Sequence, residues 1–216
     1  ITIITLGDVD VSAFMGVQTD LTDINGHWAE GYIKYCYSQG IISGRGNGRF
    51  DPNDNVTAVE AAKTLLTAIG YNSDVQGYEG AQWAINVTRD AQLSRFYEEL
   101  SVTANEYLTR DDAAQMVYNA IDATMIERTS TVDRTDGTIS DHYGPYSDGR
   151  DLLSETFGCE RDTYTLNGDH YVVSSLLEGQ ISLIDGPSGS STATITYTLD
   201  NGNEWIGEKV EVLWKD

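Results

Sequence analysis

Two short patterns in this sequence combine residue types that elsewhere bind phosphate or metal ions. The glycine-rich run at residues 44–48 resembles a phosphate-binding loop, but no strand is expected before it and no Lys-Ser/Thr pair follows it. Asp51, Asn53 and Asn55 have the alternate spacing of a calcium loop, but the positions that require Gly and Glu hold other residues. We therefore expect turns at both places and no cofactor, with Ca²⁺ left as an open alternative.

Catalytic motifs are absent from the sequence. It contains neither a GxSxG nor an HExxH pattern, and its two cysteines and three histidines stand apart from recognisable partners. Asp and Glu are so abundant that some carboxylate pairs will face each other by chance, so such pairs carry little information. We expect a protein that is not an enzyme.

The charge of the chain excludes several classes of partner. Thirteen Lys and Arg residues stand against 34 Asp and Glu, a formal net charge of −21 over 216 residues. Nucleic acid and anionic membrane surfaces both require a basic face, which this composition does not provide. No apolar run approaches the roughly 18 residues that a membrane-spanning helix needs.

Helical periodicity predicts four amphipathic segments in the first part of the chain, at residues 27–39, 58–69, 83–93 and after Thr109. Thr57 with Glu60, and Thr109 with Asp112, have the spacing of helix capping boxes. The second predicted helix has a clear apolar stripe, formed by Val59, Ala62, Leu66 and Ile69.

These segments form an internal repeat of about fifty residues. Trp28-Ala29 recurs 55 residues later as Trp83-Ala84, and the cap at Thr57 recurs 52 residues later at Thr109. A helix pair cannot bury its apolar stripes alone, so neighbouring copies must pack together. The apolar residues 1–7 are expected to be the end of a helix from a preceding copy.

The second part of the chain has the alternation of β-strands. Residues 163–166 and 170–173 flank Asn167-Gly168, a dipeptide typical of a tight hairpin turn. Further strands are expected at the following segments, the last with Val210, Val212 and Trp214 inward: 180–184, 192–199 and 209–214. We predict an α+β chain: helical repeats followed by a small antiparallel β domain.

Five segments follow from these patterns. Their predicted bounds are 1–18 for the tail of a preceding repeat, 19–72 and 73–126 for two repeats, 127–150 for a linker or loop, and 151–216 for the β domain.

The repeat resembles the S-layer homology module of bacterial surface proteins. The resemblance is carried by residues 23–29, by the loop from Gly40 to Gly44 with residues 48–52, and by Val56-Thr57 with Glu60. It covers about residues 19–126, and the more diverged second copy keeps Trp83, Thr109 and Arg110.

The resemblance implies a pseudo-threefold helical bundle, here with its first repeat mostly absent. It also implies an extracellular place at the bacterial cell surface or cell wall. The implied partners are an anionic, often pyruvylated, secondary cell-wall polysaccharide and other copies of the chain in a surface array, with no nucleic acid and no membrane insertion.

The resemblance also implies a set of glycan-binding residues. The family's second helix opens with an arginine that meets the acidic sugar; Arg110 matches it in the second copy, whereas the first copy has Ala58. Trp28 and Trp83 would stack on sugar rings, although aromatic residues on amphipathic faces are more often part of a core. Gly40 and Gly44 belong to the implied binding loop.

Two other functions remain open from the sequence. Ala58, and Arg95 at the place of Gly40, depart from the family pattern, so the repeats could have lost sugar binding and serve protein–protein assembly of a surface lattice or filament. The chain could also anchor a secreted enzyme whose catalytic domain lies outside this segment.

Overall fold

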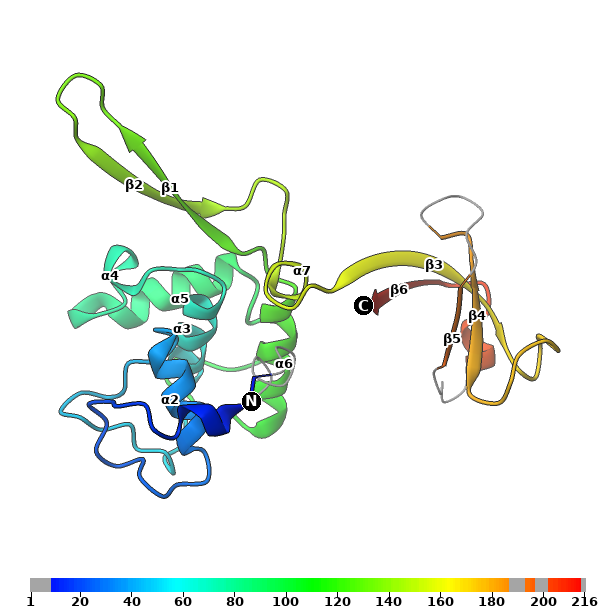
Figure 1. Ribbon diagram of the computed structural model, residues 1–216, viewed down its shortest axis with the longest axis horizontal. Coiled ribbons are helices and arrows are strands. Elements are labelled where there is room, and N and C mark those ends of the chain that lie inside the picture. The colour runs from blue at the N-terminus through cyan, green and yellow to red at the C-terminus, as the bar shows by residue number, and fades with distance from the viewer. Residues whose placement is uncertain (1–8, 187–192, 197–201, 215–216) are drawn as a thin grey trace. The chain divides into compact units, whose positions relative to one another are not determined.

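The computed structural model describes residues 9–186, 193–196 and 202–214 (Figure 1). The chain divides into two compact units, Ile1–Phe157 and Gly158–Asp216. Within the described residues, helices lie in the first unit, apart from a short 3₁₀ turn, and the second unit contains a four-stranded antiparallel sheet. The predicted α+β class is confirmed, while the helix end expected at residues 1–7 lies outside the described residues.

The four predicted helices of the first unit are present. Around them lie short elements that periodicity did not predict. The full set is η1 (Val11–Phe14), α2 (Glu30–Ser38), α3 (Ala58–Ala68), α4 (Ser73–Gln76), η2 (Gly80–Gln82), α5 (Trp83–Leu93), α6 (Arg110–Ile121) and α7 (Leu152–Glu155). Helix α3 contacts both α5 and α6, and α2 contacts η1.

The stripe predicted for α3 is buried. Val59, Ala62, Leu66 and Ile69 are each at most 1% exposed. Full burial of a Val, Leu or Ile side chain contributes roughly 1.5–3 kcal/mol, so this stripe stabilises the packing of α3. The helix is held between its neighbours by this face.

Both capping boxes are confirmed. Glu60 N donates to Thr57 Oγ1 at 3.4 Å, and Thr57 N donates to Glu60 Oε2 at 2.9 Å. Asp112 N donates to Thr109 Oγ1 at 3.1 Å, and Thr109 N donates to Asp112 Oδ2 at 2.9 Å. These bonds satisfy backbone donors that a helix start otherwise leaves unpaired.

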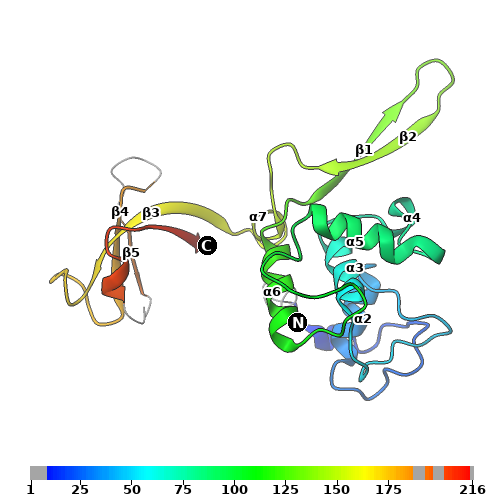
Figure 2. The same ribbon diagram turned by 180° about the vertical axis from the view of Figure 1, so that it is seen from behind.

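A β-hairpin occupies most of the segment that was predicted to be a linker at residues 127–150. Strands β1 (Ile126–Val132) and β2 (Ile139–Pro145) pair antiparallel over seven residue pairs. In Figures 1 and 2 the hairpin extends away from the helices of its own unit. The linker prediction is wrong here because polar, glycine-containing composition is equally compatible with a solvated two-stranded ribbon.

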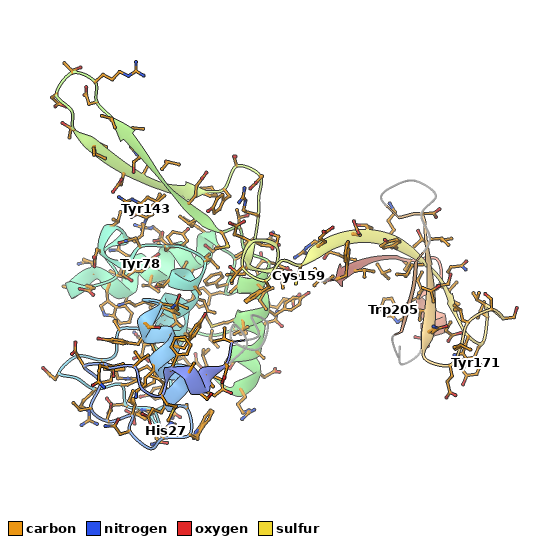
Figure 3. All side chains as sticks on the ribbon, in the orientation of Figure 1. His27, Tyr78, Tyr143, Cys159, Tyr171 and Trp205 are labelled. Atoms are coloured by element: carbon orange, nitrogen blue, oxygen red, sulfur yellow. The ribbon has the colours of Figure 1, made fainter. Side chains whose placement is uncertain are left out.

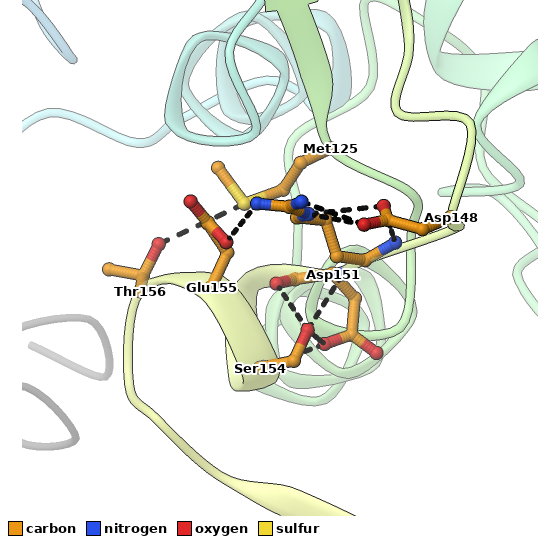
Figure 4. Close-up of polar contacts among 7 residues, drawn as sticks. Met125, Asp148, Asp151, Ser154, Glu155 and Thr156 are labelled. Carbon is orange, nitrogen blue, oxygen red and sulfur yellow. Dashed lines mark hydrogen bonds and ion pairs between the residues drawn. The ribbon is translucent and has the colours of Figure 1, made fainter.

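An arginine fixes the chain after the hairpin (Figure 4). Arg150 pairs with Asp148 at 2.7 Å and with Glu155 at 2.8 Å, and its guanidinium lies 4.6 Å from the ring centre of Tyr146. Asp151 caps α7 by accepting from Ser154 N at 2.9 Å. Residues up to Phe157 therefore belong to the helical unit, rather than to the β domain predicted to begin at 151.

The second unit is one antiparallel sheet in the order β5-β4-β3-β6. Its strands are β3 (Glu160–Asp169), β4 (Gln180–Ile184), β5 (Ala193–Thr196) and β6 (Lys209–Trp214), with η3 at Gly202–Trp205. Leu166, Ile181 and Leu183 form the core, and Tyr164, Val210 and Val212 pack against it. The ends of the strand predicted at 192–199 lie outside the described residues.

Two details of the β prediction are wrong. Strand β3 runs straight through Asn167-Gly168, where the register shifts, because a positive-φ glycine suits a bulge as well as a turn. The chain reverses after Asp169 instead, beside the exposed Tyr171 labelled in Figure 3. Trp214 is 37% exposed, so only Val210 and Val212 of the three predicted inward residues pack on the core.

Candidate functional site

A groove of about 1140 Å³ lies mainly in the first repeat. It is lined by the loop that follows α2, by one side of α3, and by residues between Ser73 and Trp83. Gly40, Gly44 and Trp83 of the predicted binding set lie in this lining. The groove brings together residues of both predicted repeats, because Trp83 opens the first helix of the second copy.

The two predicted glycines shape the groove through their backbones. Gly40 has φ of 70° and ends α2, where its N–H donates to Tyr37 O at 3.0 Å. Gly44 has φ of 81°, and a Cβ there would lie 2.8 Å from both Arg49 O and Leu21 Cδ2. Any larger residue at position 44 would have to displace the loop, so this glycine is required for the shape of the groove.

A carboxylate anchors the far end of the same loop. Asp23 Oδ1 accepts from Phe50 N at 3.0 Å, and Asp23 Oδ2 accepts from Asp51 N at 2.8 Å. These two backbone donors lower the pKa of Asp23. Asp23 is the first residue of the motif at residues 23–29, and its two hydrogen bonds hold the groove loop in place.

Sequence reasoning missed an arginine in the groove. Arg45 Nη1 lies 3.1 Å from Glu60 Oε1, and Arg45 Nη2 donates to Asn55 O at 3.3 Å. A guanidinium therefore does reach the start of α3, where Ala58 supplies no cation, but it comes from the loop. Sequence spacing could not indicate this, because the loop has to fold back before residues 45 and 60 meet.

A lysine on α3 faces the predicted tryptophan. Lys63 Nζ lies 6.0 Å from the ring centre of Trp83, within the range of a cation–π contact. Trp83 is half-buried, and both residues line the groove. Among the described residues Lys63 has no carboxylate within ion-pair distance.

The other two predicted site residues lie elsewhere. Trp28 is 73% exposed and contacts the rings of His27 and Tyr32, whose centres are 5.5 and 6.3 Å away. Arg110 is exposed on the first turn of α6 and makes no ion pair within the described part of the chain. Neither residue lines the groove.

The charges in the groove limit what it can bind. Two cations, Arg45 and Lys63, share the lining with a larger number of carboxylates, namely Asp51, Asp54, Glu60, Asp74 and Glu79. Glu60 is neutralised by Arg45, and Asp51 accepts from Arg49 Nε at 2.9 Å. A densely anionic ligand would be repelled, whereas a sugar with a single acidic group could reach Lys63.

The described residues support neither a calcium loop nor a membrane-spanning helix. No group of three or more His, Cys, Asp or Glu side chains in the described ranges is arranged to hold a metal ion. Nor does any helix within those ranges have the length and apolar composition needed to cross a lipid bilayer.

Comparison with protein families identifies part of this chain. Residues 20–62 match the model of the S-layer homology domain. The matched residues lie in the first predicted repeat and include Asp23, Gly40, Gly44, Arg45 and Glu60. The resemblance to the S-layer homology module, inferred from the motifs, is therefore confirmed.

Two relatives carry names of the same kind. A protein of Thermoanaerobacter kivui named "Cell surface protein" is 26% identical over 189 residues, which are 86% of this chain and 21% of that protein. A "Middle cell wall protein" of Brevibacillus brevis is 25% identical over 118 residues, 55% of this chain and 10% of that protein. The matched part of the chain thus spans about a fifth of the length of the first relative and about a tenth of the length of the second. No solved structure matches the chain.

Proposed function

Starting from the S-layer homology domain at residues 20–62, we propose that this chain is a structural, non-enzymatic part of a bacterial surface protein. The domain and the names of the two relatives indicate an extracellular place at the cell surface or cell wall. Its role is to hold the protein non-covalently on a secondary cell-wall polysaccharide.

The groove in the first repeat supports this proposal. Lys63 Nζ lies 6.0 Å from the ring centre of Trp83, and both residues line the groove together with Gly40 and Gly44. An indole ring offers a flat apolar surface to the face of a sugar, and an ammonium group donates to a carboxylate. This combination recognises a saccharide that carries an acidic substituent.

The finer assignment follows from the charge of the groove. Because carboxylates outnumber cations in its lining, we propose a polysaccharide whose acidic groups are spaced apart, as single pyruvyl ketals on sugar residues would be. The ketal carboxylate pairs with Lys63 and the sugar ring stacks on Trp83. We also propose that the two helical repeats belong to a pseudo-threefold bundle, as the family resemblance implies.

The experiment measures retention of the full chain on isolated cell walls that keep or lack their secondary polysaccharide. Lys63→Gln should weaken binding about tenfold, because one charge-assisted hydrogen bond is lost. Arg110→Gln is the matched control: it also removes one exposed cation, but outside the groove. Unchanged binding by Lys63→Gln would contradict the proposal, and loss only with Arg110→Gln would place the site at the start of α6.

A second arm tests the acidic substituent. Polysaccharide from which the ketal has been removed should bind the unaltered chain about tenfold more weakly, and it should no longer distinguish that chain from Lys63→Gln. A difference that persists on the neutral polysaccharide would contradict a pairing between Lys63 and the carboxylate.

A further inference from the structure

Within the described residues, strand β6 lies at an edge of the sheet in the second unit. It pairs with β3 from Glu160↔Trp214 to Thr165↔Lys209, and β3 continues to β4 on its other side (Figure 1). The described residues place no strand on the outer side of β6. An unpaired edge presents a row of N–H and C=O groups that can accept another strand.

A backbone hydrogen bond next to β6 fixes which residues of this strand face outward. Leu166 N donates to Glu208 O at 3.0 Å, so Glu208 directs its carbonyl toward β3. In an antiparallel ladder the backbone N–H and C=O groups of successive residues point alternately to the two sides of the strand. Val210 and Val212 therefore bond to β3, whereas Lys209 and Glu211 direct their N–H and C=O groups to the free edge.

The same two outward residues carry opposite charges on one face of the sheet. Lys209 and Glu211 are exposed, while Val210 and Val212 lie on the other face and are half-buried. A lysine on an edge strand usually prevents association. Here the strand itself provides a carboxylate two residues further on, and it contains no proline.

We propose that two copies of this chain associate through β6, antiparallel, with Val210 of one copy opposite Val210 of the other. This register places Lys209 of each copy opposite Glu211 of its partner, so that two opposite-charge pairs form. Both residues of each pair present their backbone groups outward, as a hydrogen-bonded antiparallel pair requires. The two four-stranded sheets then become one continuous sheet.

Charge selects this register among the alternatives. Pairing centred on Glu211 would place two carboxylates directly opposite each other, which is destabilising. Pairing centred on Val212 would place Glu211 opposite Leu213 and leave the charges unpaired. Only the register centred on Val210 matches both charges, and it keeps the valine faces of the two sheets on the same side. This surface lies in the second unit, so the association goes beyond the proposed polysaccharide binding and does not depend on it.

The test is sedimentation of the full chain over a wide concentration series. The unaltered chain should show a monomer–dimer equilibrium. Lys209→Glu and Glu211→Lys should each weaken the dimer about tenfold or more, because each puts like charges opposite one another at both pairs. An equimolar mixture of the two variants should dimerise again, because each then meets the opposite charge of the other.

Matched controls separate this surface from general charge effects. Glu178→Lys makes the same change on an exposed loop of the same unit and should leave the dimer unchanged. Circular dichroism of each variant checks that the sheet is folded, since Glu211 also pairs with Arg161 at 2.9 Å. A chain that stays monomeric, variants that dimerise as strongly as the unaltered chain, or a mixture that fails to recover would each overturn the proposal.

Discussion

The two helical repeats share a sequence pattern but differ in what covers their second helices. Both helices begin with a threonine capping box. Leu66 of α3 is fully buried, whereas Tyr118, at the equivalent position of α6, is 65% exposed. Helix α3 packs against α5 and α6, while α6 contacts α3 and the short α7. The same position is therefore core in one copy and surface in the other because of its neighbours.

The segments that flank the first helices also differ between the two copies. Arg95 takes the place of Gly40 with φ of 63°, so the helix-ending turn survives without glycine. Tyr78 takes the place of Asp23, and its hydroxyl donates to Asp90 at 2.9 Å instead of pinning a loop. Burial and this hydrogen bond raise the pKa of Tyr78. The two copies thus share the capped second helix but differ in the segments that flank the first helix.

The largest effect should come from truncating the equivalent positions of α3 and α6. Leu66→Ala should lower the free energy of unfolding by about 2–5 kcal/mol, because it removes packed methyl groups and leaves a cavity. Tyr118→Ala should cost less than about 0.5 kcal/mol, as an exposed substitution does. Denaturant unfolding of the full chain, followed by the helical circular dichroism signal, measures both. Equal losses would mean that Tyr118 is covered in solution.

A smaller loss of stability is expected at the two helix caps, and it should be the same at both. Thr57→Ala and Thr109→Ala should each destabilise the helical unit by about 1 kcal/mol, because each leaves a helix-start N–H without its acceptor. Serine at either position retains the hydroxyl and is the matched control. If only one of the two alanine variants loses stability in denaturant unfolding, the caps are not equivalent.

The smallest effect is local and depends on pH. The folded pKa of Asp23 lies below the ordinary value of about 3.9, so its contribution is complete above that value and is lost as pH falls through the folded pKa. Amide exchange at Phe50 and Asp51 should be slow at neutral pH and should lose protection on acidification. Asp23→Ala should remove the protection at neutral pH as well, whereas Tyr78→Phe should leave it intact. Protection that survives in Asp23→Ala would contradict the anchoring role.

Much of the scaffold could be predicted from local patterns. The caps at Thr57 and Thr109, the stripe of α3 and the bounds of α5 all follow from spacing within one helix. The hairpin at 126–145 and the bulge at Gly168 were missed. Composition and dipeptide signals are compatible with more than one backbone conformation at these two places, and pairing between strands determines which one forms.

The five predicted glycan-binding residues do not lie together in the structure. Gly40, Gly44 and Trp83 line the groove, while Arg110 and Trp28 lie outside it. Helical periodicity placed Trp28 on a buried or binding face, but the helix begins at Glu30, so the indole is free to turn to solvent.

The sequence by itself determined the helices, their caps, the repeat, the acidity of the chain and the resemblance to a surface-protein domain, because each depends on residues close together or on composition. Only the tertiary structure decided that Arg45 meets Glu60, that Lys63 faces Trp83 and that β6 is an edge. These depend on contacts between distant segments, whose geometry is set by how the elements pack rather than by any single element.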